Sequence, residues 1–316
     1  MSKRVILLLL PICISIFLFS FVGKNVEPPK AQIKTLIIDP GHGGIDPGAR
    51  GDFSTEANVS LAVSLKFGKA LQEEFPDLKI IYTRTTDVMA GNKRTKDEGL
   101  RYRANLANES GADLFIAIHC NSAPDIRHRQ FIGNKTVTAY TGKGKKRRKV
   151  TRKVPQYRHW TTPNPAHGTE TYIWAVSKND AKVNAVNRNT EEYGEMDSTL
   201  TIELPDPSDP AEKARMLIYA QNYFRKSLTL ADLVEKEFIA TGRFSRGVKQ
   251  RNHAGIWVLQ ATGMPSILVE LGFISDEEEE KYINSDKGQD EMVEDLVNAF
   301  RTYKQRVESR SISTMP

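Results

Sequence analysis

Short runs rich in apolar and β-branched residues recur along this chain, with helical patterns between several of them. The runs are Thr35–Asp39, Lys79–Thr83, Asp113–His119, Thr169–Val176, Ile256–Gln260 and Ser266–Leu271. A strand that is apolar along its whole length must be covered on both faces of its sheet, and α/β proteins provide that cover. The pattern therefore predicts an α/β fold: a single domain with a central mixed, roughly six-stranded sheet flanked by helices.

Three segments show the apolar spacing of amphipathic helices. The first follows Ser54 and Thr55, and Phe75-Pro76 ends it. The second contains Tyr102 and Leu106, and the third covers residues 292–300. We expect the catalytic or binding domain to span residues 31–308, followed by a C-terminal tail at 309–316.

Two stretches interrupt this alternation of predicted strands and helices. Residues 125–167 are basic and predict a surface insertion, either a hairpin or a partly disordered segment. Residues 177–241 are rich in helix formers and contain PDPSDP at Pro205–Pro210, which predicts a helical insertion of two pieces joined by a linker.

The positive charge of the chain is concentrated in the first of these stretches. Arg127 to Arg158 contains 12 Lys or Arg residues and no Asp or Glu; subtracting 12 from the net charge of +6 leaves −6 for the rest. Such a run is typical of a solvated loop, or it attracts anionic polymers or acidic lipid head groups over a long range. We expect no nucleic-acid partner, because the sequence shows no nucleic-acid-binding fold.

The N-terminus has the order of an export signal. Lys3 and Arg4 precede the apolar run Val5–Val22, and Glu27 with two prolines follows. The run lacks a clean small-x-small cleavage site, so residues 1–26 are predicted to be a signal peptide or an uncleaved N-terminal membrane anchor. We expect an exported protein of the periplasm or cell envelope. Only Cys120 lies beyond this segment, so no internal disulfide is available.

Two histidines follow predicted strands. His42 lies in the glycine-rich loop of IIDPGHGGIDPGA, and His119 ends DLFIAIH; the carboxyl ends of strands are where open α/β sheets place their sites. Glu56 opens the next helix, either as a carboxylate that the helix dipole stabilises or as a third metal ligand. Two imidazoles and one carboxylate suit Zn²⁺ with an open fourth position for water.

Glu270 lies in the apolar run of PSILVELGFIS, where a carboxylate is costly to bury unless it is paired or used. It could take a proton from the metal-bound water. Cys120 adjoins His119, but neighbouring strand residues face opposite ways, so we do not expect it to coordinate.

Five features together resemble the zinc-dependent N-acetylmuramoyl-L-alanine amidase family, the type 3 peptidoglycan amidases. They are DPGHGGIDPGA (Asp39–Ala49), Glu56, IAIHCNSA (Ile116–Ala123), HGTETY (His167–Tyr172) and PSILVELGFIS (Pro265–Ser275). By this resemblance His42, Glu56 and His119 match the ligands of one Zn²⁺ per chain, and Glu270 matches the catalytic acid/base. The chain departs from the family where Ala57-Asn58 follows the ligand glutamate, since a charged residue is frequent there.

The resemblance implies a hydrolase that cleaves the amide bond between the lactyl group of N-acetylmuramic acid and L-alanine of the stem peptide. Its role would be cell-wall remodelling or daughter-cell separation. Asn121 and Glu170 match family motifs and are candidates for binding substrate or supporting the zinc ligands. The alternatives are a catalytically gated or inactive peptidoglycan-binding protein and a zinc peptidase acting on stem peptides.

The position of the predicted helical insertion also matters under this resemblance. Some family members carry a helix there that covers the zinc cleft until an activator protein removes it. Glu191, Glu192 and Glu195 are candidate autoinhibitory plugs for the open metal position; the alternative is a solvated helix packed on the domain. For residues 127–158 the resemblance makes an anionic wall polymer or lipid a candidate partner.

Overall fold

The computed structural model describes residues 32–175, 210–252 and 256–310. Residues Ile33–Tyr303 form one compact unit. In chain order the elements are β1 (Thr35–Pro40), α2 (Glu56–Glu74), β2 (Lys79–Tyr82), η1 (Ala90–Asn92), α3 (Lys96–Glu109), β3 (Leu114–Asn121), β4 (Ile126–Thr141), η2 (Gly144–Lys146), β5 (Arg148–Thr162), β6 (Thr169–Ile173), α5 (Pro210–Ala240), β7 (Ser245–Gln250), α6 (Trp257–Ala261), β8 (Ser266–Phe273), α7 (Glu277–Asn284) and α8 (Asp286–Arg310).

A six-stranded sheet with the order β2-β1-β3-β8-β6-β7 forms the centre of the domain. All neighbouring strands run parallel except β6 and β8, which are antiparallel. This confirms the predicted mixed sheet of six strands. Because β1, β3 and β8 are parallel neighbours, their carboxyl ends meet at one edge of the sheet.

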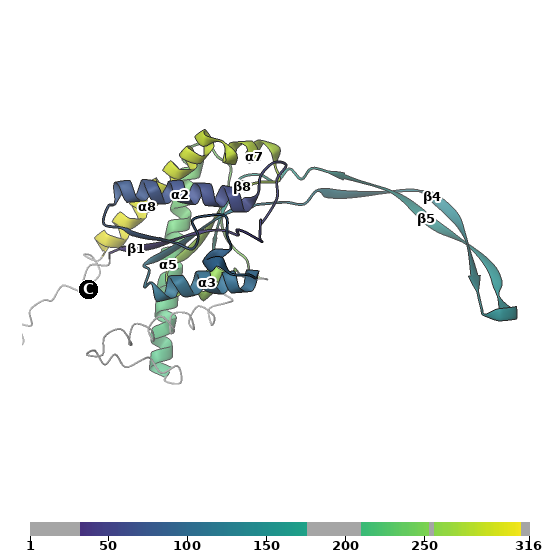
Figure 1. Ribbon diagram of the computed structural model, residues 1–316, viewed down its shortest axis with the longest axis horizontal. Helices are drawn as coiled ribbons and strands as arrows, with labels where there is room; N and C mark the ends of the chain where they lie inside the picture. The colour runs from purple at the N-terminus through teal and green to yellow at the C-terminus, as the bar shows by residue number, and fades with distance from the viewer. Residues whose placement is uncertain (1–31, 176–209, 253–255, 311–316) are drawn as a thin grey trace, which may run out of the picture. The chain divides into compact units, whose positions relative to one another are not determined.

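Helices cover both faces of this sheet (Figure 1). Consecutive strand residues face opposite sides: Ile37 of β1 belongs to a buried cluster with Ala107 of α3 and Leu259 of α6, whereas Ile38 lies beside Gly68 of α2. Figure 1 shows α2 and α8 next to each other, and the rings of Phe75 and Phe300 meet edge-on there at 5.6 Å. The three predicted helices are therefore present as α2, α3 and α8.

Two details of the predicted strand set were wrong. Ile256–Gln260, predicted as a strand, lies largely in the short helix α6, and the sixth strand is β7 at Ser245–Gln250. A run of five largely apolar residues can form either a strand or one helical turn, so a run of this length does not decide between them.

The described half of the predicted helical insertion is one of the helices of the domain. α5 packs on β6, β7 and β8 and buries Leu230, Val234 and Phe238. It connects the parallel strands β6 and β7, which need a crossover of this kind. The other half, with Glu191, Glu192 and Glu195, lies outside the described residues.

The basic stretch folds as a hairpin, the first of its two predicted forms. β4 and β5 pair with each other along their whole length and, within the described residues, with no other strand. The predicted signal peptide or anchor at 1–26 lies outside the described residues. In the part of the chain that the structure describes, no helix is both long enough and apolar enough to span a membrane.

Candidate metal centre

The loop after β1 positions His42 with its backbone in the left-handed region, at φ 57°. This conformation is strained for a residue with a side chain and needs support from its surroundings. Arg84 Nη2 donates to the carbonyl oxygen of Gly41 at 2.7 Å, and the guanidinium of Arg103 donates to that of His42 at 2.5 Å. Two buried arginines therefore fix the loop that presents the imidazole.

Two glycines allow this loop to close around the site. A Cβ on Gly41 would lie 2.5 Å from Cε1 of His119, and one on Gly48, whose φ is 67°, would lie 2.5 Å from Oε2 of Glu56. Neither space accepts even a methyl group without displacing a functional side chain. The glycine content of the loop thus follows from its close approach to the site.

Glu56 is the first residue of α2, which Thr55 caps. Its carboxylate accepts hydrogen bonds from the backbone N–H of Ala49 at 2.8 Å and of Cys120 at 3.2 Å. These bonds and the helix N-terminus favour the ionised carboxylate and fix its direction.

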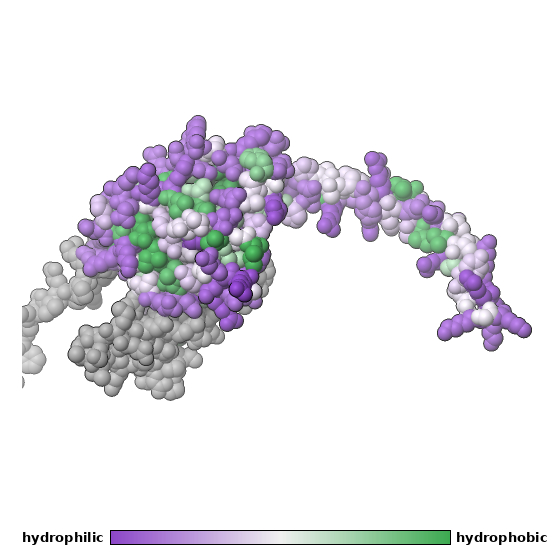
Figure 2. Space-filling model, in the orientation of Figure 1, coloured by the Kyte–Doolittle hydropathy of each residue, from purple (hydrophilic) through white to green (hydrophobic). Residues whose placement is uncertain are grey.

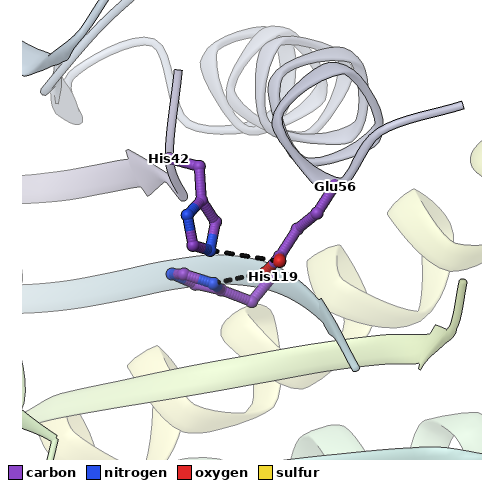
Figure 3. A group of neighbouring side chains, drawn as sticks. All are labelled: His42, Glu56 and His119. Atoms are coloured by element: carbon purple, nitrogen blue, oxygen red, sulfur yellow. Dashed lines mark hydrogen bonds and ion pairs between the residues drawn. The ribbon is translucent and has the colours of Figure 1, made fainter. Parts of the chain in front are cut away.

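His42, Glu56 and His119 converge on one point (Figure 3). Nε2 of His42 lies 3.1 Å and Nδ1 of His119 lies 2.7 Å from the two carboxylate oxygens of Glu56, and one ligand atom from each residue lies within 4.8 Å of the others. The donor set of two imidazoles and one carboxylate fits Zn²⁺ with a position left for water. The structure therefore brings together the three predicted ligands as a candidate metal site.

The protonation of this group reflects its mutual contacts. Burial alone would raise the pKa of Glu56, but the hydrogen bonds from His119 and His42 lower it below its ordinary value. Burial would likewise lower the pKa of His42, but Glu56 and Asp46 raise it. The carboxylate is thus held ionised, as a metal ligand must be.

Asp46 supports His42 and was not predicted. Its Oδ2 lies 2.8 Å from Nδ1 of His42, and its Oδ1 lies 2.5 Å from Nζ of Lys96. A carboxylate on the second ring nitrogen of a metal-binding histidine fixes the ring and its tautomer. The signal in the sequence was a second carboxylate four residues after His42 in the same loop.

Asp46→Asn is expected to weaken metal affinity by about 10- to 100-fold, because the ring of His42 loses its charged partner. Competition with a chromophoric chelator measures the affinity directly. Asp77→Asn, at an exposed turn, is the matched control and should bind metal as the wild type does. Equal affinities of Asp46→Asn and the wild type would show that the loop alone orients His42.

Glu270 lies beside this group, on β8. It pairs in register with His119 of β3, and neighbouring residues at one register position share a face of the sheet. Its side chain is buried, and Oε2 has no hydrogen-bond partner among the described residues. Burial and the negative charge of Glu56 raise the pKa of Glu270 to about 8, although Arg251 acts in the opposite direction. A buried carboxyl of this kind is suited to proton transfer near neutral pH.

Glu170 and Asn121 complete the predicted set and contact each other. Glu170 of β6 pairs in register with Glu270, and its Oε2 accepts from Asn121 Nδ2 at 3.2 Å and from the hydroxyl of Tyr172 at 2.6 Å. Arg246 and Lys249 of β7, which were not predicted, form ion pairs with its other oxygen. Burial would raise the pKa of Glu170, but these contacts lower it.

A cavity of about 560 Å³ opens onto this edge of the sheet. The three converging side chains and Glu270 line it, together with cationic, apolar and aromatic side chains that include Lys96, Leu100, Arg251, Ile256 and Trp257. A cleft of this size with a few converging polar groups is the usual form of a ligand site.

Comparisons with known proteins place these residues in a family context. A family model described as N-acetylmuramoyl-L-alanine amidase matches residues 36–302. An uncharacterized cell wall amidase of Bacillus anthracis is 24% identical over 292 residues, which are 90% of this chain and 39% of that protein. The germination-specific N-acetylmuramoyl-L-alanine amidase of Bacillus subtilis is 37% identical over 127 residues, which are 37% of this chain and 53% of that protein. The chain thus spans about half or less of the length of these curated relatives.

A solved structure shares the fold. The CwlD amidase of Clostridioides difficile, in complex with the GerS lipoprotein, superposes with a TM-score of 0.53 at 21% identity. The match covers 86% of this chain and 99% of that chain.

Proposed function

Because the chain belongs to the N-acetylmuramoyl-L-alanine amidase family, we propose that it cleaves the amide bond between the lactyl group of N-acetylmuramic acid and L-alanine of the peptidoglycan stem peptide. One observation carries the proposal. The residues that suit a metal, His42, Glu56 and His119, adjoin a buried carboxyl, Glu270, that lacks a partner among the described residues.

His42, Glu56 and His119 would hold one Zn²⁺. When bound, Zn²⁺ lowers the pKa of a water from ~15.7 towards ~7 and polarises the scissile carbonyl. Glu270 then accepts the proton of the attacking water and returns it to the nitrogen of the leaving amine. Because Glu270 is buried, water stabilises its ionised form poorly, and this keeps the carboxylate basic enough to accept the proton.

Glu170 and Asn121 contribute position rather than proton transfer. Arg246 and Lys249 hold Glu170 ionised beside Glu270, and Asn121 bonds to it. Asn121 lines the cavity, and its bond to the buried Glu170 fixes its amide, so that this amide can help to orient the substrate.

The place of action and the partners follow from the same proposal. The N-terminal export pattern supports the cell envelope as the site of action. The similar CwlD amidase was solved with a lipoprotein partner, which supports an activator protein for this chain. Glu191, Glu192 and Glu195 remain the candidate plug that such an activator would remove.

The test is mass spectrometry of the soluble products after the full-length protein digests peptidoglycan. We expect stem peptides that begin with L-alanine, lost with a zinc chelator and restored by added Zn²⁺. Peptides cut between amino acids would instead indicate a peptidase. If no product forms, a chain that lacks residues 180–204, which end before α5, separates a gated enzyme from a binding protein: only the gated enzyme becomes active on deletion.

A further inference from the structure

The β4–β5 hairpin carries a positive charge that no carboxylate offsets. No Asp or Glu lies between Ile126 and Thr162, and none of the ion pairs of the described residues involves the 12 Lys and Arg residues of 127–158. The hairpin's residues are mostly exposed on both faces. Such a concentration of unpaired charge favours a polyanionic partner.

The cations are divided evenly around the hairpin. Strand pairing places four on one face, four on the other and four in the turn. The first face carries Lys135, Arg148, Arg152 and Arg158; the second carries Arg127, Arg129, Lys149 and Lys153; the turn carries Lys143, Lys145, Lys146 and Arg147. On the face visible in Figure 2, hydrophobic residues form separate small patches along the hairpin.

This distribution argues against insertion into a lipid surface. An element that inserts into the surface of a bilayer needs one apolar face for the membrane and one polar face for water. Here each face carries four cations, so neither can enter the acyl region without burying charge. A flexible linear polyanion has no such restriction, because it can follow both faces and the turn.

Two aromatic residues of the hairpin hold cations. The guanidinium of Arg129 lies 4.4 Å from the ring centre of Tyr157, and that of Arg147 lies 4.5 Å from that of Tyr140. A stacked guanidinium keeps its N–H fork free for phosphate. These two contacts therefore leave guanidinium groups available to phosphate. Phe131 and Trp160 are also exposed, and bases can stack on such rings, so single-stranded DNA is compared in the test.

We propose that the β4–β5 hairpin binds a linear polyol phosphate polymer of the cell envelope, with cations of both faces and the turn contacting its phosphodiester groups. The choice of an envelope polymer rests on the export proposed above. The binding itself is independent of catalysis, so the two proposals can fail separately.

The test titrates poly(glycerol phosphate) against the full-length protein at several salt concentrations. Two variants replace the four cations of one face with glutamine: Lys135, Arg148, Arg152 and Arg158 in the first, and Arg127, Arg129, Lys149 and Lys153 in the second. A control removes four exposed lysines elsewhere: Lys69, Lys236, Lys281 and Lys287. Each face variant should lose at least about tenfold in affinity and show a shallower salt dependence, while the control stays within about twofold of the wild type.

Several results would overturn the proposal. An equal loss in the control would mean that net charge alone is responsible, and the absence of any binding would exclude this partner. Tighter binding to single-stranded DNA would indicate a nucleic-acid site. Binding to vesicles of phosphatidylglycerol is compared between the variants, because all of them keep the apolar N-terminal run. If the face substitutions weaken vesicle binding more than polymer binding, the partner of the hairpin is a lipid surface. Thermal unfolding of each variant verifies that the domain is folded.

Discussion

Replacing Glu270 with glutamine is expected to abolish amide hydrolysis while the metal content stays that of the wild type. Glutamine keeps the size of the side chain but cannot accept the proton of the attacking water, a contribution of about 10²- to 10⁴-fold in rate. The side chain lies beside the three converging side chains without belonging to that group. Product formation and metal content by atomic spectroscopy are measured on the same sample. Loss of metal in this variant would show that Glu270 is a ligand.

The same substitution is also expected to change how the stability of the protein depends on pH. The pKa of Glu270 in the metal-free folded protein is raised from 4.5 to about 8. Between these pH values the unfolded chain has released the proton of Glu270 while the folded protein still holds it, so the free energy of unfolding falls as the pH rises. Glu270→Gln should therefore be more stable than the wild type in the metal-free state at pH 8 and equal to it at pH 4. Glu278→Gln, on an exposed position of α7, should show neither this difference nor a loss of activity.

His119→Ala is expected to lose both the metal and the activity. The substitution removes the Nδ1 atom that lies 2.7 Å from Glu56 and leaves two ligands where Zn²⁺ needs at least three from the protein. We expect metal affinity to fall by more than the ~100-fold that outer contacts contribute, and hydrolysis to fall to background at ordinary zinc concentrations. Isothermal titration with Zn²⁺ measures the first effect and product analysis the second.

Thermal unfolding gives an independent readout of the same substitution. A metal that binds the folded state raises its stability by mass action, so added Zn²⁺ should raise the Tm of the wild type and leave that of His119→Ala unchanged. His167→Ala is the matched control, since this exposed histidine bonds only the carbonyl oxygen of Pro165 among the described residues. An unchanged zinc response of His119→Ala would refute its role as a ligand.

The central strands could be predicted from sequence because burial on both faces leaves a continuous apolar run, as in β3 and β8. The strand β7 escaped prediction for the opposite reason. It lies at the edge of the sheet, pairs with β6 alone among the described strands and is partly exposed, so its sequence SRGVKQ needs few apolar residues. The helix α6 was misassigned because a single helical turn is too short to show the spacing of apolar residues that is typical of a helix.

For the site, the sequence indicated three of the four main candidates because each lies near the end of a strand or opens a helix, and Glu270 because it is a carboxylate within an apolar run. The supporting residues were missed because their roles depend on approaches between distant segments. Arg103 lies on α3 yet bonds the backbone of His42, and Arg246 lies on β7 yet pairs with Glu170 of β6. Nothing local in either sequence neighbourhood indicates these partners.

The order of the strands along the chain determines when the candidate site can be completed during synthesis. The three converging side chains all come from residues 42–119, whereas Glu270 lies on β8, the last of the described strands yet an inner one of the sheet, between β3 and β6. A growing chain therefore contains all three converging side chains before Glu270, the proposed proton acceptor, is added with β8. Under the proposed function, hydrolysis can begin only once β8 has been made, after most of the chain.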